Sequence, residues 1–166
     1  MHTLSTKIRC LLDKLILITC GFSLILLVVT VTWQVFSRYV LNDPSSFTDE
    51  LSRYTMIWLG LLGASYLFGK RGHLAITLLA DSLPPKANRI LQCLINLLVL
   101  SFVNLAMLKG GLALIGRTMQ QFSPALHIPM AYVYFILPIS AVVITIYILL
   151  NIVDEFAQDS SNPIKE

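Results

Sequence analysis

The sequence predicts an all-α membrane protein with four transmembrane helices, and three observations support this prediction. Of its 166 residues, 56% are hydrophobic. Only 13% are charged, whereas soluble domains carry roughly 25% charged residues. Long uncharged runs alternate with short polar segments, and the longest runs suffice to cross the roughly 30 Å hydrocarbon core of a bilayer. The net charge of +3 is too small to indicate a nucleic-acid-binding protein.

The first transmembrane helix is predicted over residues 14–40. It follows a basic leader, residues 1–13, and contains the uncharged run 15–37. This run is longer than the apolar core of a cleaved secretory signal, so we expect an uncleaved anchor. Tyr39 lies toward the far end of the helix, where amphipathic rings favour the membrane interface.

The second helix is predicted over residues 48–69, after a turn that contains Asn42 and Pro44. Its uncharged part, residues 54–69, rises only about 24 Å as a helix, which is less than a bilayer core. A spanning helix therefore has to begin near Thr48. That start places three charged residues of its first turns at the membrane boundary, where unpaired charges are costly.

Small residues on the second helix indicate a packing surface. Gly60, Gly63 and Ala64 form a stripe that another helix can approach closely, as in many membrane helix pairs. Trp58 lies in the first half of the same helix.

The third and fourth helices are predicted over residues 86–115 and 128–153. Pro138 is expected to kink the fourth helix, because proline cannot donate a backbone hydrogen bond. The apolar stretch 74–80 is too short to span, so we expect a short interfacial helix between the second and third helices. Residues 154–166 form a polar tail.

The distribution of basic residues predicts that both termini are cytoplasmic, because cytoplasmic loops are enriched in Lys and Arg. If the chain crosses the membrane four times, both termini lie on the same side. The basic residues on that side are Lys7, Arg9, Lys14, Lys70, Arg71, Lys86, Arg89 and Lys165. The opposite side receives Arg38, Arg53, Lys109 and Arg117. The junction between the first two helices then faces the periplasm.

The charges at this junction allow three roles. Glu50 and Arg53 are three residues apart and share a helix face, while Arg38 leaves the first helix at the same boundary and can meet Asp49 or Glu50. The cluster is a structural clamp between helices or to a partner subunit, a solvated group of interfacial charges, or a site that handles an ion or substrate directly. The sequence favours the clamp.

The sequence contains no motif typical of a catalytic site, and it therefore does not indicate an enzyme. The histidines His2, His73 and His127 do not form the matched pairs that a haem or metal site requires, so we expect no cofactor. His73 is interpreted as a helix-end or head-group contact. The central runs of the helices carry no acid of the kind that couples an ion in a small antiporter. This pattern favours an accessory subunit.

A set of motifs resembles a known family, the small permease subunit of tripartite ATP-independent periplasmic (TRAP) transporters. The motifs are Arg38-Tyr39, Asn42, Pro44, Phe47-Thr48-Asp49-Glu50, Arg53-Tyr54, Trp58, Gly63-Ala64 and Gly72-His73-Leu74. With the four predicted helices, the resemblance covers about residues 14–155. Ser37 and Phe47 stand where the family pattern has glycine and tryptophan.

The resemblance implies a multi-pass scaffold protein of the bacterial inner membrane, in contact with membrane lipids. A large membrane subunit would carry the sodium and substrate sites, and a periplasmic binding protein would deliver a C4-dicarboxylate, sialic acid or another sugar acid. Structural or partner-contact roles would fall to Arg38, Tyr39, Asn42, Asp49, Glu50, Arg53, Trp58, Gly63 and His73. The competing interpretation is a self-sufficient homo-oligomeric transporter or channel.

Overall fold

The computed structural model describes residues 2–70 and 85–160, and within these ranges it contains helices and turns but no strand. Its helices are α1 (His2–Tyr39), α2 (Ser46–Gly69), α4 (Pro85–Phe102), the π-helix η1 (Val103–Lys109), α5 (Gly110–Thr118), α6 (Met130–Tyr134) and α7 (Ile136–Ser160). The all-helical prediction is confirmed. His73 and the predicted interfacial helix, residues 74–80, lie outside the described residues.

Three helical stretches of the described chain are long and apolar enough to cross a membrane. They are Thr6–Tyr39, Leu94–Thr118 and Met130–Ile152. Helix α2 is not among them, although its 24 residues rise about 36 Å. The polar first turns of α2 lower its average hydropathy, as the sequence indicated.

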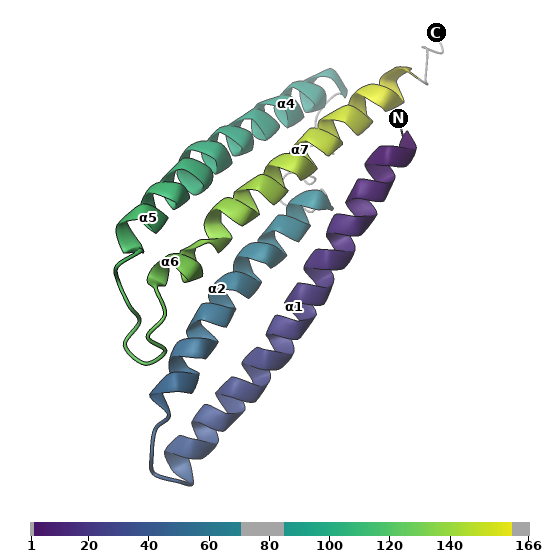
Figure 1. Cartoon of the computed structure of the whole chain (residues 1–166). Helices are drawn as coiled ribbons and strands as arrows, with labels where there is room; N and C mark the ends of the chain where they lie inside the picture. The colour runs from purple at the N-terminus through teal and green to yellow at the C-terminus, as the bar shows by residue number, and fades with distance from the viewer. Residues whose placement is uncertain (1, 71–84, 161–166) are drawn as a thin grey trace.

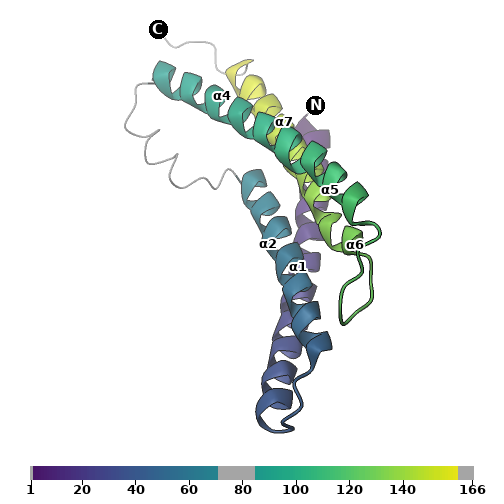
Figure 2. The ribbon, with the colours of Figure 1, turned by 90° about the vertical axis from the view of Figure 1, so that its left-hand side faces the viewer.

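The helices pack in a row rather than in a closed bundle. Helix α1 packs along α2, α2 packs against α7, and α7 packs against η1 in the middle of the continuous α4–η1–α5 rod. Figure 1 shows this order, with α7 between α2 and the rod, and Figure 2 shows the row from its edge. Because α7 has neighbours on two sides, it supplies more of the buried core of the described residues than any other helix, including Ile136, Ile144 and Tyr147.

Small hydroxyl residues line the contact between α1 and α2. Thr30 and Ser37 of α1 are buried, as are Thr48, Ser52 and Thr55 of α2. Many of these hydroxyl groups donate to a carbonyl of their own helix; Thr30 Oγ1, for example, lies 2.9 Å from Leu26 O. Short side chains let the two backbones approach closely, which is how membrane helices commonly associate.

The close approaches involve glycines other than those that the sequence suggested. A Cβ atom at Gly60 or Gly63 would meet no heavy atom within 4 Å, so the predicted packing surface has no partner among the described residues. By contrast, a Cβ atom at Gly69 would lie 2.6 Å from the Tyr147 ring. One at Gly111 would lie 3.0 Å from Leu137 Cβ and 3.1 Å from Pro138 Cδ.

Helix ends differ from the predicted ranges at several places. Helix α7 continues to Ser160, so part of the predicted polar tail, residues 154–166, is helical. Helix α1 begins at His2, so residues of the basic leader are helical and extend the first predicted helix. The rod continues to Thr118, beyond the predicted end at residue 115. The last helix is interrupted at Phe135, between α6 and α7, three residues before Pro138. This interruption agrees with the expected effect of a proline that lacks a backbone donor.

Candidate functional site: a polar junction at one end of the helices

The turn between α1 and α2 is held by serine side chains. Ser45 is the N-cap of α2, and its Oγ accepts from Thr48 N at 3.5 Å. The helix therefore begins at Ser46, two residues before the predicted start at Thr48. Asn42 has a φ of 53°, a left-handed conformation that asparagine tolerates well. Ser45 N in turn donates to Ser37 Oγ of α1 at 3.4 Å.

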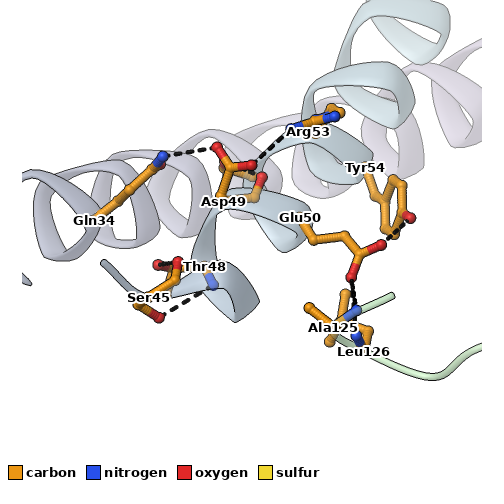
Figure 3. Close-up of polar contacts among 10 residues, drawn as sticks. Gln34, Ser45, Thr48, Asp49, Glu50, Arg53, Tyr54, Ala125 and Leu126 are labelled. Atoms are coloured by element: carbon orange, nitrogen blue, oxygen red, sulfur yellow. Dashed lines mark hydrogen bonds and ion pairs between the residues drawn. The ribbon is translucent and has the colours of Figure 1, made fainter. Parts of the chain in front are cut away.

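Asp49 links α2 to α1, but through a glutamine rather than an arginine. Gln34 Nε2 of α1 donates to Asp49 Oδ1 at 2.8 Å, and Arg53 pairs with Asp49 Oδ2 at 2.6 Å (Figure 3). The Arg53 side chain is 68% exposed, and exposed pairs of this kind contribute little stability. Arg38 is exposed and makes no hydrogen bond or ion pair within the described chain, so the expected meeting with Asp49 or Glu50 does not occur.

Glu50 points in a different direction from Asp49 (Figure 3). Figure 3 shows its carboxylate between Tyr54 and the backbone of residues 125 and 126. Tyr54 Oη donates to Oε1 at 2.5 Å, while the backbone amides of Ala125 and Leu126 donate to Oε2 at 2.8 and 2.9 Å. The residue is only 8% exposed. Burial of a carboxylate is tolerated here because both oxygens accept hydrogen bonds.

The partner of Glu50 is a hairpin formed by residues 119–129, between α5 and α6. Two backbone bonds close it: Ser123 N to Ile128 O at 2.9 Å and Met130 N to Gln121 O at 2.8 Å. Inside it, His127 N donates to Ser123 O at 3.2 Å. This single turn leaves neighbouring amides pointing in one direction, an arrangement that suits an anion.

Trp58 lies one helical turn after Tyr54 on α2, and it connects α2 to the last helix. Its Nε1 donates to Val133 O at 3.1 Å. Val133 belongs to α6, whose last carbonyls have lost their usual helical donors at the interruption before α7. The indole therefore satisfies a carbonyl that the break exposes.

A second polar cluster, which no sequence motif predicted, joins the opposite ends of the same helices. Asp13 of α1 accepts from Lys70 Nζ at 2.8 Å and from Tyr147 Oη of α7 at 2.6 Å. The hydrogen bond and charge of Asp13 raise the pKa of Lys70 above its ordinary value, so the ammonium stays charged. Residues so far apart along the chain give no common motif in the sequence.

Arg9 and Asn151 extend this second cluster. Arg9 NH1 donates to Asn151 Oδ1 at 2.9 Å and to Gly69 O at 3.0 Å, and Asn151 Nδ2 donates to Phe68 O at 3.3 Å. Two spacings in the sequence are consistent with this cluster. Arg9 and Asp13 are four residues apart, and so are Tyr147 and Asn151 in an otherwise apolar helix. Such pairs share one helix face.

The described residues contain no group of three or more His, Cys, Asp or Glu side chains that could hold a metal ion. The arrangement instead connects helices: one polar junction and one polar cluster fasten the two ends of α1, α2 and the last helix. These features define a helical membrane protein whose described polar side chains join its own helices.

Comparison with known proteins places this membrane protein in a family. The chain belongs to the DctQ component family of tripartite ATP-independent periplasmic transporters, whose model matches residues 27–158. It is therefore a TRAP small permease, a multi-pass protein of the inner membrane that functions in transport and not as an enzyme. The resemblance seen in the sequence motifs is confirmed.

Individual relatives agree with the family match. A Haemophilus influenzae protein assigned as a TRAP transporter small permease is 28% identical over 142 residues, which cover 86% of this chain and 88% of the relative. The sialic acid TRAP transporter small permease protein SiaQ of Vibrio cholerae is 33% identical over 84 residues, 51% of this chain and 49% of SiaQ. The isethionate TRAP transporter permease protein DctMQ of Oleidesulfovibrio alaskensis is 24% identical over 121 residues, 69% of this chain and 19% of DctMQ.

Proposed function

We propose that this chain is the non-catalytic scaffold subunit of a sodium-coupled TRAP importer of an organic acid. It works with a large membrane subunit and a periplasmic binding protein, and the sodium and substrate sites lie in the large subunit. The family match over residues 27–158 carries this proposal. Relatives named as sialic acid and isethionate permeases support an organic acid as the substrate class, with a C4-dicarboxylate or another sugar acid as further members.

The hydrogen bonds of three acids, Glu50, Asp49 and Asp13, support a scaffold role. Glu50 has both oxygens engaged by protein donors, and Asp49 accepts from Gln34 and Arg53. Asp13 accepts from Lys70 and Tyr147. A carboxylate that couples sodium must offer an oxygen to the ion, and these three acids already have protein partners. We therefore assign sodium coupling to the partner subunit and no cofactor to this chain.

We further propose four spans with both termini in the cytoplasm. Helix α2 runs alongside α1 over most of its length, because Gln34 meets Asp49 at one end and Asp13 meets Lys70 at the other. Three stretches satisfy the length and hydropathy of a span on their own, and α2 lies at the same depth as one of them. In its first turns Thr48, Glu50 and Ser52 are buried, and Arg53 pairs with Asp49, which lowers the cost of placing these residues at the boundary.

Among the residues singled out by the motifs, we assign buried members to scaffold integrity and exposed members to partner contacts. Glu50 and Trp58 hold α2 to the rest of the chain. Tyr39 is 74% exposed, and Gly63 has open space beside it, so both are available to another subunit. We expect His73 to lie at a helix end near lipid head groups.

Reconstitution in proteoliposomes tests the proposed function. The purified chain alone should move no radiolabelled sialic acid or C4-dicarboxylate under a sodium gradient. Addition of the co-purified large subunit and of the binding protein should produce uptake of one of these acids. Uptake by this chain without a partner would favour the self-sufficient transporter instead. In the complete complex, absence of uptake when sodium is present at equal concentration on both sides would support sodium as the driving ion.

A further inference from the structure

We propose that Glu50 is a positioning residue: its carboxylate holds the 119–129 hairpin against α2, and transport requires this position rather than the negative charge. The inference rests on the proposed function, because it concerns the transport that the complete complex performs. It assigns to Glu50 neither sodium nor substrate.

The geometry of the carboxylate carries the inference. Glu50 Oε2 accepts from two successive amides of the hairpin at 2.8 and 2.9 Å, and Oε1 accepts from Tyr54 Oη at 2.5 Å (Figure 3). The side chain is 8% exposed, so water replaces these donors only after the hairpin moves away. Tyr54 Oη also lies 3.2 Å from Met130 Sδ, at the point where the hairpin enters α6.

The charge itself has no cationic partner in the described part of the chain. Arg53, the nearest arginine along α2, pairs with Asp49 rather than with Glu50, as Figure 3 shows. The donors to Glu50 are neutral groups, two amides and one phenol. A neutral side chain of the same length can therefore accept from the hairpin, whereas a shorter charged side chain falls short of it.

The hairpin presents its other side away from Glu50. Phe122 is 63% exposed and Met119 is 58% exposed, while Ser123, which closes the turn of the hairpin, is 1% exposed. Backbone bonds close the hairpin, and Glu50 fixes its turn, residues 125 and 126, to α2. A loop held in this way offers a defined surface to another subunit, and loss of Glu50 frees that surface to shift.

Four variants in the complete complex separate position from charge: Glu50→Gln, Glu50→Asp, Glu50→Ala and Asp43→Ala. Asp43→Ala is the matched control, because it removes an exposed negative charge at the same end of the helices. We expect uptake by Glu50→Gln and Asp43→Ala to stay near the wild-type rate. Uptake by Glu50→Ala and Glu50→Asp should fall about tenfold or more, the effect of losing hydrogen bonds to a charged acceptor. The ratio of large subunit to small subunit after purification should remain unchanged.

Hydrogen–deuterium exchange of the same complexes reports on the hairpin independently of transport. Amides of residues 125 and 126 should exchange about tenfold faster in Glu50→Ala and Glu50→Asp, and close to the wild-type rate in Glu50→Gln. Loss of uptake in Glu50→Gln with an unchanged hairpin would overturn the inference, since charge would then matter. Normal uptake in Glu50→Ala with a loosened hairpin would overturn it too. If the Glu50→Ala complex does not assemble, the uptake rates of Glu50→Gln and Glu50→Asp test the inference: Glu50→Gln should be faster than Glu50→Asp, and the reverse order would overturn it. Failure of the proposed function would show in the wild-type complex itself.

Discussion

Gly69 lies at the end of α2, where the ring of Tyr147 packs against the backbone. A Cβ atom at this position would lie 2.6 Å from the ring, which is 0% exposed and tied to Asp13 by a hydrogen bond. The ring has little room to move, so we predict that Gly69→Ala destabilises the protein by about 1 to 3 kcal/mol, as overpacking of a buried site does. Thermal unfolding in detergent, followed by the loss of helical circular dichroism, measures this change as a lower midpoint.

Gly63→Ala is the matched control for this substitution. Both glycines belong to α2, but a Cβ atom at Gly63 would meet nothing within 4 Å. Alanine favours a helix over glycine by up to about 1 kcal/mol, so Gly63→Ala should leave the midpoint unchanged or raise it slightly. Equal destabilisation by both substitutions would show that helix geometry, and not the Tyr147 ring, sets the cost at Gly69.

At the scale of helices, the break between α6 and α7 depends on a donor from α2. Pro138 cannot donate to Tyr134 O, and the helix is interrupted at Phe135. Carbonyls near such an end need other partners. Trp58 Nε1 supplies one to Val133 O at 3.1 Å, so the tryptophan stabilises the interruption and fastens α2 to it.

Trp58→Phe should therefore weaken the contact between α2 and the last helix. The phenyl ring keeps most of the apolar contact but leaves Val133 O without the indole donor, at a cost of about 0.5 to 1.5 kcal/mol. Trp33→Phe serves as the control, because Trp33 is 51% exposed and its indole makes no hydrogen bond among the described residues. Circular dichroism during thermal unfolding should show a lower midpoint for Trp58→Phe alone, and equal midpoints would contradict the assigned role of Trp58.

Helix-level features that depend on local sequence were predictable. The uncharged runs located α1, the α4–η1–α5 rod and α7, and Pro138 indicated the interruption near Phe135. The extension of α1 back to His2 was not, because a basic leader has no hydrophobic pattern that marks it as helix. The π-helix within the rod was missed for a related reason: a shift from four-residue to five-residue hydrogen bonding leaves no distinct pattern in an apolar run.

At the scale of the whole molecule, the contacts that the sequence did not predict are those between residues far apart along the chain. The motifs located the junction, but Glu50 accepts from backbone amides of residues 125 and 126, which have no side-chain signature. Arg38 was an equally reasonable partner for Asp49 until the helices were placed, and Gln34 takes that position instead. The cluster around Asp13 joins residues up to 142 positions apart, so only the packed helices reveal it.

The two polar groups together argue for the membrane topology. Arg9 and Asp13 near the start of α1 meet Asn151 near the end of the last helix and Lys70 at the end of α2, so these three ends lie together at one end of the molecule. Three spans would separate the termini, whereas four keep them together. Because α2 returns beside α1, we predict that both termini face the cytoplasm and that the turn at Asp43 faces the periplasm, in accordance with the excess of Lys and Arg near the termini.

Single-cysteine variants of the full chain, made after replacement of its three native cysteines, test this topology. A membrane-impermeant maleimide applied to intact spheroplasts should label Asp43→Cys and Gln120→Cys, and should label Lys7→Cys and a cysteine appended after Glu166 only once the membrane is opened. All four positions lie in exposed or terminal parts of the chain. Labelling of the appended cysteine in closed spheroplasts, with Lys7→Cys protected, would instead indicate three spans, and α2 would then have to leave the bilayer despite its contacts along α1.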